Sequence, residues 1–187
     1  MGTGRVGVIL LSLIGPISDL PRGWVEAKSK DGRVTFAMPI KPTERTVEQK
    51  VAKKDIKVLE YSCTAGKCLY RLEKSPVPIE MPEEKLAGAL KASRDAIAKK
   101  NKILEDRETT LAGWPARELV IEAPLKPGAD PSKVAMLLFY ADNEFYQVRV
   151  FALEPGRDPK DAPRVFRFRQ TQDREAGQIV KTMSFDG

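Results

Sequence analysis

The sequence predicts an α+β fold in which an antiparallel β-sheet is flanked by helices. The chain has 187 residues, 42% hydrophobic and 31% charged, which suits one domain with a buried core and excludes a multi-span membrane protein or a mostly disordered chain. One stretch with the periodicity of an amphipathic helix interrupts a series of short runs in which apolar and polar residues alternate. Turn signals separate these runs, as expected for antiparallel strands.

The first distinctive segment is apolar. Arg5 precedes the run VGVILLSLIGPI at residues 6–17, which is shorter than the ~20 residues that a membrane-spanning helix needs. A basic residue before an apolar run of this length is typical of a secretory signal, although no pair of small residues follows for cleavage. We expect a signal peptide or N-terminal anchor over residues 1–23, a single domain over residues 24–187, and export to a periplasmic or extracellular location. A buried N-terminal strand is the alternative.

Two runs then predict the beginning of the sheet. The sequence VTFAMP at residues 34–39 follows an Asp-Gly turn signal and ends at a proline, as a short strand would. Residues 41–57 are polar and charged, which indicates a solvated loop and strand edge.

A hairpin around Cys63 and Cys68 is the next element. If the four residues between the cysteines form the loop, Cys63 faces Cys68, Tyr61 faces Tyr70 and Glu60 faces Arg71. Facing strand positions are close enough for a disulfide, which also suits an exported protein. A free dithiol in a cytosolic protein and half of a metal site are the alternatives.

Residues 82–100 have the clearest helical pattern. Pro82 and the acids Glu83 and Glu84 suit the first turn, and lysines follow the last turn. Apolar residues recur at helical spacing on one face only, so we expect this helix to lie on the sheet.

Four strands should follow, at residues 104–110, 117–123, 134–141 and 144–153, the first of them at an edge. A turn at Asp142-Asn143 would pair Phe139 with Tyr146 on a wholly apolar face, which we expect the helix to cover. The reverse face is mixed, with Met136 opposite Arg149.

The C-terminal segment has two periodicities. Residues 165–169 alternate like a strand but also fit a helical face, and residues 173–183 favour a helix. Arg164, Arg167 and Arg169 interleave with phenylalanines in a pattern that could hold an anionic polymer or a membrane surface. The alternative is that the rings are core and the arginines are ordinary solvated charges.

Three stretches carry a family resemblance: VTFAMP at 34–39, LAGWPARE at 111–118 and MSF at 183–185. With the order of elements, they resemble the PsbP-like superfamily, which includes extrinsic photosystem subunits, Ran-binding Mog proteins and exported bacterial proteins. The resemblance implies a PsbP-like α/β/α sandwich that acts by binding, without catalytic residues.

The chain contains no histidine, which excludes imidazole-based hydrolysis and histidine-ligated zinc or haem. The acids at residues 105–108 alternate faces around Arg107, as on a hydrated edge strand, so we expect no metal site there. We therefore expect a non-enzymatic exported binding or scaffold domain with an unknown protein or small-molecule partner and no cofactor. Polyanion or membrane-surface binding through residues 164–169 is one alternative, and a histidine-free hydrolase is another.

Overall fold

A computed structural model of the chain describes residues 23–29, 34–51, 54–77, 81–111, 114–125, 128–141, 143–154, 166–172 and 179–185. In chain order the elements are β1 (Val25–Lys28), β2 (Val34–Met38), β3 (Thr43–Val51), β4 (Lys54–Ala65), β5 (Cys68–Pro76), α1 (Glu83–Ala98), β6 (Lys102–Leu111), β7 (Trp114–Pro124), β8 (Pro131–Ala141), β9 (Glu144–Ala152), β10 (Phe166–Gln172) and β11 (Ile179–Phe185).

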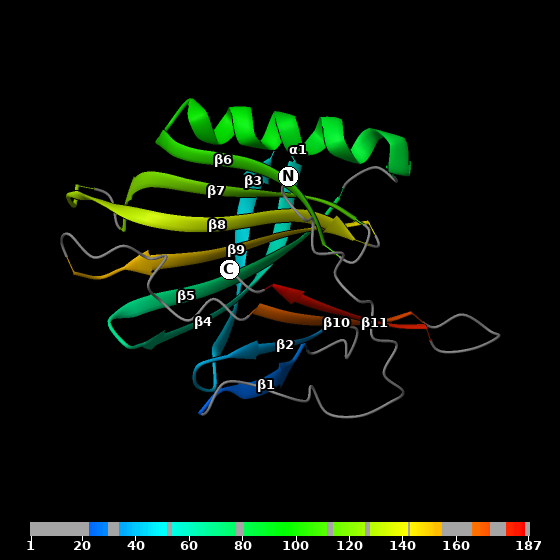
Figure 1. Cartoon of the computed structure of the whole chain (residues 1–187), viewed down its shortest axis with the longest axis horizontal. Helices are drawn as coiled ribbons and strands as arrows, with labels where there is room; N and C mark the ends of the chain where they lie inside the picture. The colour runs from blue at the N-terminus through cyan, green and yellow to red at the C-terminus, as the bar shows by residue number, and fades with distance from the viewer. Residues whose placement is uncertain are drawn as a thin grey trace, which may run out of the picture.

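The described strands form two antiparallel sheets. The large sheet has the order β3-β4-β5-β9-β8-β7-β6, and the small sheet has the order β1-β2-β10-β11. The large sheet is strongly twisted, so that β3 runs nearly perpendicular to β7 and β8 in the view of Figure 1. We call the side of the large sheet that contacts α1 the helix face, and the opposite side the sandwich face.

The expected helix-flanked sandwich is therefore wrong, although the antiparallel sheet is confirmed. Within the described residues there is one helix, and the sandwich face packs against a second sheet. The expected helix at residues 173–183 is wrong for residues 179–183, which belong to β11 and pair with β10, whereas residues 173–178 lie outside the described residues. Residues 179–182 are Ile, Val, Lys and Thr, and β-branched side chains of this kind favour strands over helices.

The sandwich face carries the larger core. The Phe36 ring of β2 lies 4.8 Å from the Tyr61 ring of β4, and Trp24 contacts Tyr70 edge-on at 6.1 Å. Buried residues from both sheets complete this core: Met38, Cys63, Cys68, Leu72, Ala116, Leu137, Phe139, Ala141, Tyr146 and Val150.

The helix covers the opposite face from the one we expected. The prediction put it over the apolar side of β8 and β9, but Leu90 packs with Leu119 and Leu138 on the mixed side. A helix is about 10 Å wide and strands are about 4.8 Å apart, so one helix covers only two or three strands. The apolar face extends over more strands than that, and a second sheet is the cover that fits it.

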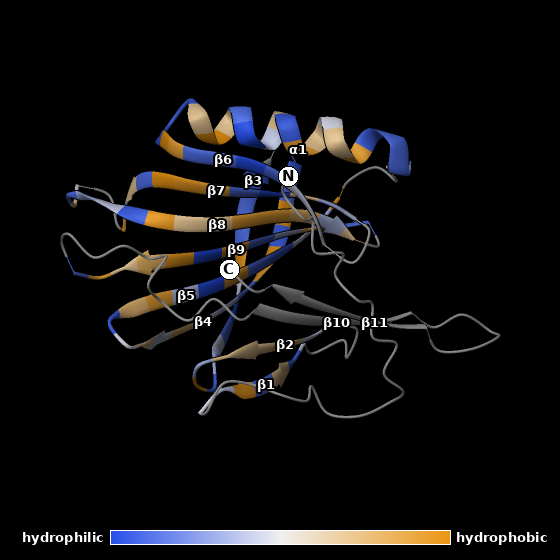
Figure 2. Ribbon diagram, in the orientation of Figure 1, coloured by the Kyte–Doolittle hydropathy of each residue, from blue (hydrophilic) through white to orange (hydrophobic). Residues whose placement is uncertain are grey.

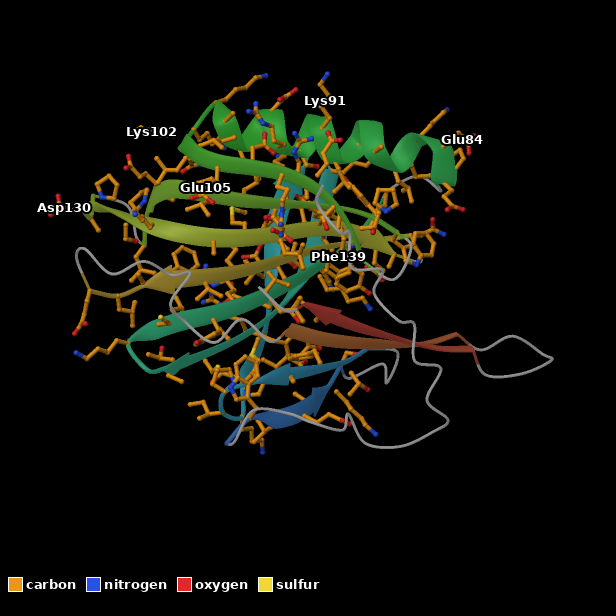
Figure 3. All side chains as sticks on the ribbon, viewed as in Figure 1. Glu84, Lys91, Lys102, Glu105, Asp130 and Phe139 are labelled. Carbon is orange, nitrogen blue, oxygen red and sulfur yellow. The ribbon has the colours of Figure 1, made fainter. Side chains whose placement is uncertain are left out.

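Helix α1 begins and ends close to the predicted residues. Pro82 has an extended backbone and precedes the helix, and Glu83 and Glu84 lie in the first turn. Figure 3 shows Lys91 projecting from the side of α1 turned away from the sheet. Leu86 and Leu90 are the buried helix residues, which confirms that one side of α1 is apolar.

The β4–β5 hairpin adopts a different register from the predicted one. Gly66 and Lys67 both have positive φ, 54° and 65°, and form a two-residue turn that such φ values permit. As a result Cys63 faces Tyr70, Cys68 faces Ala65 and Tyr61 faces Leu72.

The predicted disulfide is consequently absent, because Cys63 and Cys68 are not bonded to each other. The two cysteines are diagonal neighbours, and diagonal positions lie about 7–8 Å apart, at or beyond the limit for a disulfide. The β8–β9 hairpin, by contrast, has the predicted register throughout, and the rings of Phe139 and Tyr146 are stacked at 4.8 Å.

Strand β6 lies at the edge of the large sheet, as predicted, and contains a β-bulge. The register shifts between Ile103 and Glu105, so Leu104 has no partner across the pair. Beyond the bulge, Arg107 faces Glu118 and Glu108 faces Arg117.

The predicted signal or anchor spans residues 1–23, of which residues 1–22 lie outside the described residues. Among the helices that are described, none has the length and apolar character needed to cross a bilayer.

Candidate functional site: a charged half of the helix face

Of the predicted anion-binding residues, Arg164 lies outside the described residues, and Arg167 and Arg169 belong to β10. Strand β10 is an inner strand of the small sheet, between β2 and β11. Arg169 faces Thr35 of β2, which is only 5% exposed, while the next residue, Phe36, is fully buried. At this point, therefore, neither face of β2 is open to solvent. Anion binding by these arginines stays a prediction.

The two cysteines belong to the core of the sandwich face. Both are buried, and burial raises the pKa of the Cys63 thiol while a hydrogen bond with the backbone of Ile40 opposes that shift. A buried thiol with a raised pKa is a poor nucleophile and metal ligand. Across the described residues, no group of three or more His, Cys, Asp or Glu side chains is arranged to hold a metal ion.

The helix face has two halves of different chemistry. Figure 2 shows β8 as hydrophobic along most of its length and β3 as mainly hydrophilic. Helix α1 packs on β7 and β8, whereas β3, β4, β5 and β9 carry charged and polar side chains on the same face. We call this second part the charged half; it consists of Arg45, Glu60, Arg71, Glu73, Gln147 and Arg149.

Strand register places like charges directly opposite one another in the charged half. Glu60 of β4 faces Glu73 of β5, and Arg71 of β5 faces Arg149 of β9. Facing like charges are destabilising on a sheet. The repulsion is offset on the diagonals, where Arg71 forms an ion pair with Glu60 and Arg149 forms one with Glu73.

The contacts of this cluster extend across four neighbouring strands. Arg45 donates from Nε to Glu60 Oε1 at 2.8 Å and from Nη2 to Glu60 Oε2 at 3.0 Å. The Arg71 Nε atom lies 3.4 Å from Glu60 Oε2. Arg149 donates from Nη2 to Glu73 and also to Gln147 Oε1, the latter at 3.1 Å. These ion pairs therefore link β3 with β4, β4 with β5 and β5 with β9 over two neighbouring rows of the sheet.

The carboxylates of the charged half are more buried than its guanidinium groups. The side chains of Glu60 and Glu73 are 5% and 9% exposed, whereas those of Arg71 and Arg149 are 21% and 24% exposed. Burial lowers the pKa of the Arg149 guanidinium, and the nearby Glu73 carboxylate opposes this shift. The arginines therefore lie between the buried acids and solvent.

Phe151 of β9 connects the charged half to the apolar half. The guanidinium carbon of Arg71 lies 5.4 Å from the centre of the Phe151 ring, within the range of a cation–π contact. Phe151 also belongs to the apolar cluster beneath α1, together with Leu90 and Leu138. One ring thus forms part of the core on one side and supports a cation on the other.

A second charged network lies at the opposite edge of the helix face and joins α1, β6 and β7. Asp106 of β6 accepts hydrogen bonds from Arg117 Nε at 2.6 Å and from Arg94 Nε of α1 at 2.7 Å. The Arg117 hydrogen bond, followed by that of Arg94, lowers the pKa of the Asp106 carboxyl, and burial opposes them. This network joins the helix to the sheet edge, and its role is structural.

Sequence reasoning did not identify the charged half as a site. It placed Glu60 opposite Arg71 in the wrong register and placed Arg149 on a face that it left largely uncovered. A usable signal is present, because two strands carry polar residues two positions apart, at Arg71 and Glu73 and at Gln147 and Arg149. Residues two apart share a face of a strand. Which strands are neighbours, however, is set by the topology.

The sequence matches no protein-family model and no curated protein.

Proposed function

We propose that this protein is a non-enzymatic binding domain that works after export and holds its partner on the charged half of the helix face. The observation that carries this proposal is the facing pair Arg71 and Arg149, partly exposed above buried acids and beside the Phe151 ring. Arginine and aromatic residues that lie together at a partly desolvated position are the residue types that dominate binding surfaces.

The energetics of the cluster also support a binding role. Removing ionised groups from water costs free energy, and well-packed apolar residues in place of a buried ion pair are often as stable or more stable. Helix α1 and the apolar side chains beneath it supply such packing on the neighbouring strands. Fold stability alone therefore gives little reason to keep three arginines and two glutamates at this place.

The proposal includes the PsbP-like resemblance and export as expectations. The resemblance rests on the sequence stretches at residues 34–39, 111–118 and 183–185. Export rests on the basic residue and apolar run at residues 5–17.

Capture of a partner tests the binding role. Immobilised wild-type protein, the double variant R71Q/R149Q and the control R107Q are incubated with the exported fraction of the source cells. Arg107 is 68% exposed, pairs with Glu118 and projects from the sandwich-face side of edge strand β6, so it is a matched control. We expect wild type and R107Q to retain the same protein or metabolite and the double variant to lose it.

Equal capture by all three proteins would refute the assigned surface, provided that the double variant keeps the circular dichroism spectrum of wild type. If the double variant is unfolded, R71K is used instead, because it keeps the charge but not the planar five-donor group.

Polyanion binding through Arg164, Arg167 and Arg169 is the alternative function. This alternative is tested by replacing the three arginines with alanine and measuring retention on heparin at low salt. Unchanged retention would refute polyanion binding through these residues. For the histidine-free hydrolase, turnover of ester or amide substrates that survives R71Q/R149Q would favour catalysis over binding.

A further inference from the structure

Among the described residues, two arginines of the charged half each carry a buried N–H group that makes no hydrogen bond. An arginine has five N–H donors and no acceptor, so each buried N–H needs an oxygen or another acceptor nearby. Within the part of the chain that the structure describes, the Nε atoms of Arg71 and Arg149 are buried and make no hydrogen bond, although the Arg71 Nε atom lies 3.4 Å from Glu60 Oε2 in an ion pair. A buried donor without an acceptor costs about 1–3 kcal/mol.

These two donors belong to residues on neighbouring strands at the same level of the sheet. Arg71 and Arg149 face each other across β5 and β9. Arg71 pairs with Glu60 on β4. Arg149 pairs with Glu73 on β5 and with Gln147 on its own strand. The position between the two facing side chains is therefore flanked by a guanidinium group on each side, and these contacts include no acceptor shared by both.

The charge of the cluster points in the same direction. Three guanidinium groups and two carboxylates meet here, which leaves one positive charge in excess. Since burial disfavours the charged form of Arg149, an anion beside it would be stabilising. Guanidinium groups also match the two oxygens of a carboxylate or phosphate better than any other side chain does.

We propose that Arg71 and Arg149 bind an oxyanion group, a carboxylate or a phosphate, at the position between them. This inference rests on the proposed binding function and names the chemistry of its ligand. Phe151 stacks against Arg71 and limits its orientation, which reduces the entropy lost when the guanidinium group is fixed by a ligand. Glu60 pairs with Arg71 and Glu73 pairs with Arg149, and these ion pairs hold the two arginines in place.

The experiment observes the two Nε–H groups directly by nuclear magnetic resonance of the arginine side chains. The ¹⁵N-labelled full chain is titrated with inorganic phosphate, and separately with sodium acetate, at constant ionic strength set with chloride. The variants R71K and R149K assign the two resonances, and R107K is the control. We expect at least one anion to shift both resonances with a saturable curve, and R71K to bind that anion about tenfold more weakly while R107K is unchanged.

The anion that saturates identifies the class of ligand, phosphate or carboxylate. The inference is overturned if neither anion produces a saturable shift, or if R71K binds as tightly as wild type. Such a result, together with partner capture that R71Q/R149Q abolishes, would leave the binding function standing and remove only the oxyanion. If neither anion binds and R71Q/R149Q captures the partner as well as wild type does, the proposed binding function is refuted together with the oxyanion site.

Discussion

The two halves of the helix face belong to the same sheet and yet are stabilised in different ways. Under α1, Leu90, Leu119 and Leu138 exclude water, and such burial contributes about 25 cal/mol per Å² of apolar surface. Across β3, β4, β5 and β9, ionised groups are partly removed from water and are compensated mainly by one another, with Gln147 and Phe151 as further contacts. From this comparison we expect the apolar half to contribute more to stability than the charged half does.

The largest effect should come from the apolar half. Leu138 is fully buried on β8 in the cluster beneath α1. The substitution L138A removes this packing and leaves a cavity, and we expect it to lower the free energy of unfolding by about 3 kcal/mol. Urea denaturation measures this change. L153A, at a leucine that is 38% exposed, is the control and should change stability by less than about 0.5 kcal/mol. A small effect of L138A would mean that α1 does not pack where the structure places it.

A smaller loss is expected when one partner is removed from the charged half. E73Q deletes the carboxylate that pairs with Arg149 and leaves a mostly buried cation behind. Because the Arg149 side chain still reaches solvent, we expect a loss of about 2 kcal/mol, below the 3–5 kcal/mol typical of fully buried pairs.

Replacing both partners sharpens the comparison between the halves. The double variant E73L/R149M removes both charges and adds apolar groups, and we expect its stability to lie within about 1 kcal/mol of wild type. Denaturant unfolding of the single and double variants completes the test. If the double variant were less stable than E73Q, the charged half would contribute to stability as strongly as the apolar half does.

The smallest effect concerns the pH dependence of stability at Asp106. Its pKa in the folded protein is lowered from the ordinary value of 3.8, so its contribution is fully present above pH 3.8 and is lost as the pH falls through the lower, folded-state pKa. We expect D106N to cost about 0.5–1 kcal/mol at pH 7, since the ion pairs are partly exposed. The difference between wild type and D106N should shrink as unfolding is measured at progressively lower pH below 4. A constant difference would show that the carboxylate charge is not the stabilising feature.

The sequence predicted individual strands better than it predicted the packing between layers. The β8–β9 hairpin could be derived because its turn residues leave one plausible loop length and its facing residues agree. At the β4–β5 hairpin the cysteine pair suggested a four-residue loop, whereas Gly66 permits a tighter turn that moves every pairing along the strand. The matching of facing side chains in the predicted hairpin therefore did not determine its register.

The candidate site was beyond sequence reasoning for a related reason. Arg71 and Arg149 are far apart in the chain, and they meet because β5 pairs with β9 across a long crossover. No local pattern encodes this pairing. The alternation within each strand does show which residues share a face, and that part could be predicted.

The bulge at Leu104 shows that strand register can control electrostatics as strongly as residue identity does. If Leu104 paired with Val120 and there were no bulge, the pairing beyond it would move by one position, so that Arg107 would face Arg117 and Asp106 would face Glu118. Two attractive pairs would become two repulsive ones, with no change in amino-acid composition. Closing the bulge is therefore a more severe change than most substitutions in this strand, because it alters every partnership downstream at once.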